Sequence, residues 1–128
     1  MTSGFCYKAV IAVVLLGAIM TSHAKTADQP LIRIAELEID PGHLPAYTDA
    51  LKEEIATSLR VEPGVLKLYA VSVKNQANQI RILEVYKDQA AYESHLQTPH
   101  FKKYKSGTQN MVKSLKLIET DAILLGEK

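Results

Sequence analysis

Apolar and polar positions in the first half of the chain follow two different periods. Residues 31–39 form an aliphatic run that predicts a strand, and the Asp-Pro-Gly sequence of residues 40–42 ends it as a turn. Between residues 44 and 59 apolar side chains recur at steps of three and four, which predicts an amphipathic helix. Its predicted buried stripe consists of Leu44, Tyr47, Leu51, Ile55 and Leu59. The Glu-Pro-Gly sequence of residues 62–64 closes this helix, because proline disfavours a helical conformation in the residue before it.

Residues 65–74 and 79–86 predict two strands joined by a hairpin loop at residues 75–78. The first of these strands is apolar on both faces. Val65, Tyr69, Val71 and Val73 lie on one face, and Leu66, Leu68 and Ala70 lie on the other. A sheet with two apolar faces must be covered on both, and the predicted helices can cover only one. We therefore expect a homodimer in which the second face meets the sheet of another subunit.

Two helices and a strand are predicted after the hairpin. Asp88 is a good N-cap for a short helix that carries His95 near its end. Thr98 and Pro99 end that helix and begin the next, because threonine caps a helix and proline fits its first turn. The next helix has a predicted stripe of Phe101, Tyr104, Thr108, Met111, Val112 and Leu115, and residues 117–125 predict a fourth strand. This order of elements is the split βαβ arrangement of a ferredoxin-like α+β sandwich.

The N-terminal segment has the features of a signal peptide. Lys8 precedes an apolar run at residues 9–20, and Ser22-His23-Ala24 offers small residues at the two positions that a signal peptidase reads. We expect residues 1–24 to be a signal peptide and residues 25–128 to be one mature domain, periplasmic or secreted, with no stable membrane span after cleavage. An uncleaved membrane anchor is the alternative. Cys6 lies before the apolar run, so the mature domain has no thiol nucleophile.

The charge of the chain is nearly balanced. It has 15 basic and 14 acidic residues, and removal of Lys8 leaves the mature domain formally neutral. A neutral domain argues against binding to nucleic acid. Five lysines between residues 102 and 116 are interpreted as the solvated side of an amphipathic helix, with a site for an anionic partner as the alternative.

His95 and His100 lie on either side of the junction between the two later helices, where they form the densest cluster of groups that titrate near neutral pH. His95 either reaches into a pocket or donates to the carbonyls that close its helix. His100 is in the first turn of its helix, so a surface or capping role is expected. No two histidines have the i, i+4 spacing with a nearby acid that marks a zinc helix, and we expect no dedicated metal site.

The segments EVYKDQAAYESH (residues 84–95) and HLQTPHFKKY (residues 95–104) resemble the antibiotic biosynthesis monooxygenase family, in particular its small quinol monooxygenase-like proteins. The resemblance covers nearly all of residues 31–125. It implies a dimeric α+β barrel with a pocket between sheet and helices in each subunit. It also implies oxygenation of electron-rich aromatics by dioxygen without metal or flavin. Tyr86 stands where many members carry tryptophan, and the first strand lacks the asparagine of the haem-degrading branch, which argues against haem degradation.

Cofactor-free oxygenation needs a base, an apolar cavity and a few orienting donors. On the resemblance, His95 is the candidate base for a small aromatic substrate. The candidate pocket residues are Tyr47, Tyr69, Tyr86, His100, Phe101 and Tyr104. Each tyrosine has a core or interface role as its alternative.

Two other function classes stay open. One is a small-molecule isomerase, because the chain also resembles an isomerase of a phosphorylated quorum-sensing sugar derivative. The predicted export signal argues against that substrate, which is made inside the cell. The other class is a non-catalytic protein that binds a small ligand or serves in stress.

Overall fold

The computed structural model describes residues 29–126, and the predicted signal peptide lies outside this range. Four antiparallel strands form one sheet in the order β2-β3-β1-β4. The strands are β1 (Leu31–Ile39), β2 (Val65–Val73), β3 (Gln76–Tyr86) and β4 (Val112–Thr120). The helices are α1 (Leu44–Val61), α2 (Gln89–Gln97) and α3 (Pro99–Thr108), with a short 3-10 turn, η1 (Pro41–His43), before α1. The predicted ferredoxin-like α+β fold is confirmed.

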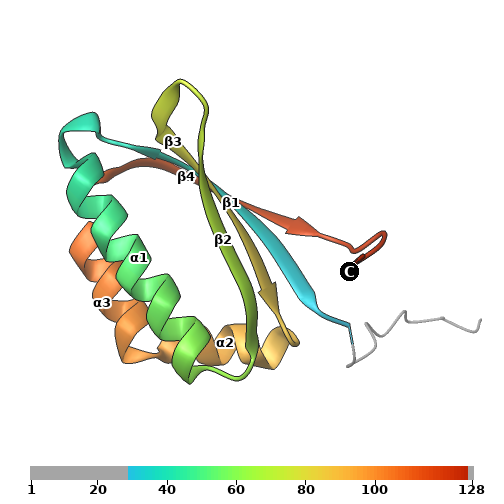
Figure 1. Ribbon diagram of the computed structural model, residues 1–128. Helices are drawn as coiled ribbons and strands as arrows, with labels where there is room; N and C mark the ends of the chain where they lie inside the picture. The colour runs from blue at the N-terminus through green and yellow to red at the C-terminus, as the bar shows by residue number, and fades with distance from the viewer. Residues whose placement is uncertain (1–28, 127–128) are drawn as a thin grey trace, which may run out of the picture.

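The helices lie together on one face of the sheet. Figure 1 shows α1 and α3 side by side, with α2 at the end where α1 finishes and α3 begins. We call the face that they cover the inner face. It carries Ala35, Leu37, Ile39, Ile80 and Ile82, which pack against Tyr47 and Leu51 of α1. No helix in residues 29–126 is long and apolar enough to cross a membrane.

Local capping chemistry fixes where the helices begin. The Asp88 carboxylate accepts the backbone N–H of Ala91 at 2.7 Å and starts α2. The Thr98 hydroxyl accepts the N–H of Phe101 at 3.3 Å and starts α3, with Pro99 in the first turn. The predicted junction between the two helices is therefore confirmed.

The end of α3 differs from the prediction. The helix stops at Thr108, and β4 begins at Val112, so the predicted helical stripe beyond Thr108 and the predicted strand at residues 117–125 are both placed too late. Leu115 and Leu117 lie opposite Leu37 and Ala35 of β1, which puts both leucines on the inner face. Residues 112–117 satisfy a period of two as well as a period near 3.6, and pairing with β1 decides for the strand. Lys113 and Lys116 consequently lie on β4 and not on a helix.

The hairpin between β2 and β3 is tighter than predicted. β2 ends at Val73 and β3 begins at Gln76, so only Lys74 and Asn75 form the turn, and the predicted loop at residues 75–78 is wrong. Asn75, the second of these two residues, has a φ of 66°, a left-handed conformation that asparagine tolerates in turns. Residues 76–78 are thereby free to join the strand.

The buried face of α1 is also rotated from the predicted stripe. Leu59 is 46 % exposed, whereas Glu54 and Ser58 are buried. The helix therefore presents two polar side chains to the interior next to Leu51. Buried polar groups require hydrogen-bond partners, and those of Glu54 and Ser58 belong to the site described below.

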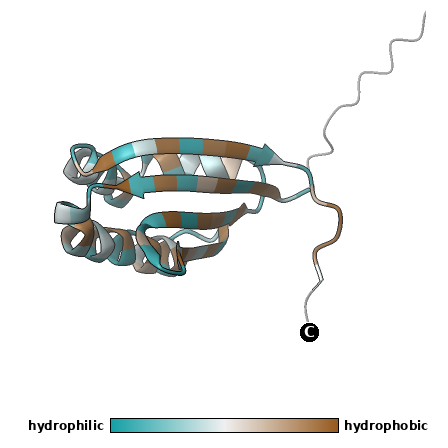
Figure 2. Ribbon diagram, turned by 90° about the horizontal axis from the view of Figure 1, so that it is seen from above, coloured by the Kyte–Doolittle hydropathy of each residue, from teal (hydrophilic) through white to brown (hydrophobic). Residues whose placement is uncertain are grey.

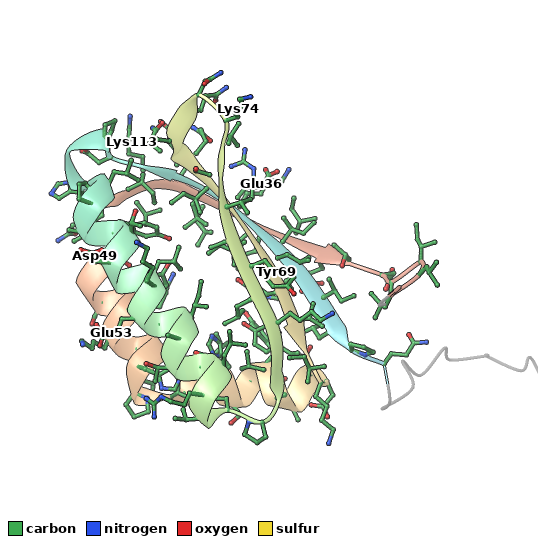
Figure 3. The ribbon with its side chains drawn as sticks, in the orientation of Figure 1. Glu36, Asp49, Glu53, Tyr69, Lys74 and Lys113 are labelled. Carbon is green, nitrogen blue, oxygen red and sulfur yellow. The ribbon has the colours of Figure 1, made fainter. Side chains whose placement is uncertain are left out.

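The opposite, outer face of the sheet is uncovered in the single chain. Strand alternation places Tyr69, Val71 and Leu83 on this face, where Tyr69 is 58 % and Val71 60 % exposed. Figure 2 shows how apolar and polar residues alternate along the strands. In Figure 3, Tyr69 lies on the side of β2 that points away from α1. Strand β2 has apolar side chains on both faces, as the sequence predicts, while Glu36 and Arg81 form an ion pair on the outer face of the neighbouring strands. The dimer remains a prediction.

Candidate functional site

A cavity of about 360 Å³ lies between the inner face of the sheet and the helices. Most of its wall is aliphatic or aromatic. Its polar and aromatic lining includes Glu54, Glu84, Tyr86, Tyr92, His95, Phe101 and Tyr104. An apolar cavity of this size with a few converging polar groups is the usual form of a small-molecule site.

His95 is held firmly in the wall of this cavity. It lies in the last turn of α2, its side chain is 4 % exposed, and its ring centroid is 4.7 Å from that of Phe101 and 5.3 Å from that of Tyr86. The Thr98 hydroxyl donates to the His95 carbonyl at 2.8 Å, which fixes the backbone below the ring. The orientation of the imidazole is thus set by packing and by the capped junction together.

Glu62, the C-cap residue of α1, connects the two histidines. Its Oε1 lies 3.0 Å from His95 Nδ1 and 2.5 Å from His100 Nε2. Burial raises the pKa of Glu62, but the hydrogen bonds from His95 and His100 outweigh burial and hold that pKa below its usual value. Because an ionised carboxylate only accepts, both ring nitrogens must donate to it. His95 therefore keeps its proton on Nδ1, and Nε2 is left facing the interior.

The turn that carries Glu62 packs tightly against α2. A Cβ added to Gly64 would lie 2.5 Å from the Ala91 Cβ, and the Gly64 carbonyl accepts the Lys87 N–H at 2.8 Å. Only glycine permits this approach of the two backbones. Gly64 therefore helps to bring Glu62 within reach of both histidines.

Glu54 supplies a second carboxyl group beside His95. Its Oε1 accepts the Ser58 hydroxyl at 2.7 Å and lies 3.6 Å from His95 Nε2, beyond hydrogen-bond distance. Burial raises the pKa of Glu54 above its ordinary value, despite the hydrogen bond from Ser58 and the nearby imidazoles. The deep end of the cavity thus pairs an imidazole nitrogen with a carboxyl group that holds its proton more tightly than an exposed one.

A third carboxyl group, Glu84, lies on β3. Burial raises its pKa, although the Tyr86 hydroxyl donates to it at 3.2 Å and Arg33 lies nearby. Arg33 itself donates to the Tyr92 hydroxyl at 2.6 Å, stacks 4.2 Å over that ring and pairs with Glu119. Both terminal nitrogens of the guanidinium are therefore engaged beside the cavity, whereas its buried Nε has no hydrogen-bond partner among residues 29–126.

The buried tyrosines remain neutral hydrogen-bonding groups. The hydroxyls of Tyr47 and Tyr104 lie 2.6 Å apart. Burial raises the pKa of Tyr47, Tyr86 and Tyr104 above that of free tyrosine. These side chains can orient a polar ligand but do not compete with His95 as bases.

The structure brings four of the predicted site residues together at the cavity: His95, Tyr86, Phe101 and Tyr104. Tyr47 reaches it through its hydrogen bond to Tyr104. His100 lies behind the wall, bound to Glu62, with 16 % of its side chain exposed. Tyr69 corrects the prediction, because Leu68 points inward and its neighbour must then point to the outer face.

Glu54, Glu62 and Glu84 were missed by the sequence analysis. Glu62 was interpreted as the residue that closes a helix, and Glu54 lies between Leu51 and Ile55 of the predicted stripe. The available signal was the pair Glu54 and Ser58 at i, i+4 on α1, which a helix can join by a hydrogen bond.

The group formed by Glu54, His95 and His100 is also relevant to metal binding. Within the described part of the chain, donor atoms of Glu54, His95 and His100 come within 4.8 Å of one another. The absence of a dedicated metal site remains a prediction. One nitrogen of each ring already donates to Glu62, so each ring has only its other nitrogen to offer to a metal ion.

Comparison with known proteins agrees with this geometry. The sequence profile described as antibiotic biosynthesis monooxygenase matches residues 30–106. The crystal structure of a candidate antibiotic biosynthesis monooxygenase from Bacteroides thetaiotaomicron is 51 % identical, covers 80 % of this chain and 97 % of its own, and superposes with a TM-score of 0.76. A Pseudomonas aeruginosa protein is 26 % identical with a TM-score of 0.70, covering 77 % of this chain and 98 % of its own.

An uncharacterized protein of Synechocystis is 23 % identical over 110 residues, which cover 81 % of this chain and 74 % of that protein. The matched profile includes the whole sheet except β4 and all of the residues around His95. The chain therefore belongs to the antibiotic biosynthesis monooxygenase family.

Proposed function

We propose that the protein is a cofactor-independent monooxygenase that oxidises a quinol or another small hydroxylated aromatic with dioxygen. The observation that carries this proposal is the orientation of His95. Its Nδ1–H is held by Glu62 at 3.0 Å, while Nε2 lies 3.6 Å from Glu54, a residue that lines the cavity with it. A neutral imidazole fixed in this tautomer is suited to accept a proton from a phenol near neutral pH.

The rest of the cavity supports the same chemistry. Deprotonation makes an aromatic diol electron-rich enough to pass an electron to dioxygen, and recombination at a ring carbon gives a hydroperoxide. Loss of water then leaves a hydroxyquinone: the substrate gains one oxygen atom and loses two hydrogens, which leave with the second oxygen. The mostly aliphatic and aromatic wall supports these steps because it limits contact with bulk water, and Tyr86 and Tyr104 in that wall support hydrogen bonding to the substrate.

An isomerase is the second candidate, and the pairing of His95 with Glu54 favours it. The two groups lie 3.6 Å apart, one able to take a proton and the other to hold one. Such a pair could move a proton between two atoms of a ligand without dioxygen. A non-catalytic role as a small-ligand carrier would use the cavity alone.

Oxygen uptake with a panel of hydroquinones tests the first function. We expect uptake by the wild-type protein and a loss of about 10²–10⁴ in turnover for His95→Ala, the usual range for removal of a general base. His95→Gln keeps a donor for Glu62 but no basicity, so it should be as inactive. His43→Ala is the matched control, because His43 is half exposed in the turn before α1.

Three outcomes would argue against the assignment. Activity restored by His95→Gln would make His95 structural, and ligand conversion without oxygen consumption would favour the isomerase. A ligand that binds the cavity and leaves unchanged would favour the carrier.

We also propose how the protein assembles and where it is located. The exposed apolar outer face supports a homodimer, sheet against sheet, and the apolar run at residues 9–20 supports export to the periplasm or beyond. Mass spectrometry of the exported protein should find Lys25 at its N-terminus. A membrane-held protein that begins at Met1 would contradict the predicted cleavage.

A further inference from the structure

The chain of contacts from His95 through Glu62 to His100 crosses the wall of the protein. His95 lines the cavity but Glu62 and His100 do not. Glu62 and His100 line a separate surface groove of about 620 Å³, together with Gly64, Lys87 and Asp88, which we call the outer groove. A buried imidazole is thus connected to solvent by two hydrogen bonds that bypass the cavity.

The negative charge of Glu62 restricts how many protons His95 and His100 can carry together. Glu62 is an anion that accepts an N–H from each ring, and a buried anion is costly unless a cation accompanies it. Two cationic rings would repel each other, because their centroids are only 6.4 Å apart. One added proton on the pair of rings would balance the charge of the Glu62 carboxylate, and two would exceed it.

The groups around the two rings do not change the charge balance between the rings and Glu62. The charged and titratable groups near the two rings include Glu54 on α1, Glu84 and Tyr86 on β3, and the exposed pair of Glu53 on α1 with Lys103 on α3. Lys87 and Asp88 line the outer groove with His100, and Tyr104 lies near His100 on α3. Burial raises the pKa values of Glu54 and Glu84, which disfavours further negative charge beside the rings. Lys103 is already paired with Glu53 at 2.6 Å.

We propose that His95 and His100 share one proton through Glu62, so that His100 releases a proton to the outer groove when His95 takes one up from the cavity. The proton gained at His95 Nε2 is matched by the proton lost from His100 Nδ1. Both rings keep their N–H bonds to Glu62, and no proton has to cross the carboxylate. The net charge of the buried cluster stays constant.

The shared proton matters because His95 is a base in a cavity that a substrate would fill. A substrate that fills the cavity blocks the direct route between His95 and water, but the outer groove stays open. Glu62 and His100 then act as positioning residues, which set the protonation of His95 from the other side of the wall. This consequence for turnover rests on the proposed function, whereas the shared proton does not.

Nitrogen NMR of the ¹⁵N-labelled histidine rings tests the shared proton without any substrate. In the wild-type protein near neutral pH, the protonated fractions of His95 and His100 should sum to about one. His95→Gln keeps an N–H donor to Glu62 but cannot take the proton, so the protonated fraction of His100 should rise toward one. Glu62→Gln removes the anion, and the sum should fall toward zero.

His43→Gln, at the far end of α1, should leave both fractions unchanged. A wild-type sum near zero or two, or a His100 fraction that ignores His95→Gln, would overturn the proposal. The wild-type sum decides the matter even if a variant fails to fold. If the two histidines share the proton but the protein consumes no oxygen, the proposed function is wrong and the shared proton still stands.

Discussion

The two faces of the sheet carry different side chains on the same strands. On the inner face, apolar side chains of β1 and β3 line a cavity with Glu54, Glu84 and His95, each of which has a defined partner. On the outer face, Tyr69 and Val71 are exposed, and the two charged side chains of Glu36 and Arg81 pair with each other. Because successive side chains alternate, a single strand such as β2 sends Leu68 to the cavity and Tyr69 to the surface. The cavity and the exposed outer face are thereby separated by one residue.

The largest effect that would test this division is expected on the outer face. Val71→Asp would place a charge in the predicted sheet-to-sheet interface, opposite an Arg81 that already pairs with Glu36, at a cost of several kcal/mol. We expect the wild type to be a dimer at micromolar concentration and Val71→Asp to be a monomer or an aggregate. Sedimentation measures this directly.

Lys74→Gln is the matched control, because it changes the net charge by the same amount at the exposed tip of the hairpin, as Figure 3 shows. It should remain dimeric. A soluble wild-type monomer would remove the interface from consideration and leave the apolar outer face without an explanation.

The sequence predicted those parts of the molecule that depend on neighbouring residues. Asp88 and Thr98 cap their helices through backbone groups only three residues away, so their roles follow from local rules. The extent of β1 follows from its aliphatic run in the same way. The boundary between α3 and β4 did not follow, because the apolar residues there fit both periods and only pairing with β1 selects one.

The contacts that Glu62 makes with His95 and His100 could not be predicted for a related reason. Glu62 and His95 are 33 residues apart in sequence, and they meet because the turn at Gly64 packs on α2. The side that Tyr69 faces depends on the parity of a whole strand, which the bulge after Val65 changes relative to β3. Each of these features depends on tertiary contacts that a linear pattern does not contain.

The next largest effect is expected for Glu62, which connects the two histidines. Glu62→Gln removes the carboxylate that accepts from both histidines, and an amide can accept from one of them only. We expect the free energy of unfolding to fall by about 2–3 kcal/mol, the range for a charged group that loses its buried partner. Urea denaturation at neutral pH measures this loss.

Glu53→Gln provides the contrast for that experiment. Glu53 belongs to the same helix but pairs with Lys103 at the surface, where both side chains are more than half exposed. Surface pairs contribute about 0–1 kcal/mol, so stability should barely change. Equal losses for the two variants would mean that the cluster is not tighter than an ordinary surface pair.

The smallest expected effect is the pH dependence that Glu54 gives to stability. Burial raises the pKa of Glu54 in the folded chain, so the native state holds this proton more tightly than the unfolded state does. Stability from this group is therefore fully present below the unfolded pKa of about 4.3 and is lost as pH rises through the higher folded value. Glu54→Gln keeps an acceptor for Ser58 and removes the titration. The variant should be more stable than the wild type at neutral pH, by about 1.4 kcal/mol for each unit of the shift, and the difference should vanish near pH 4. Urea denaturation across this range measures it, with Glu53→Gln as the exposed control. A difference that grows as pH falls would mean that Glu54 is stabilised as an anion, and Glu54 would then be the partner of a protonated His95.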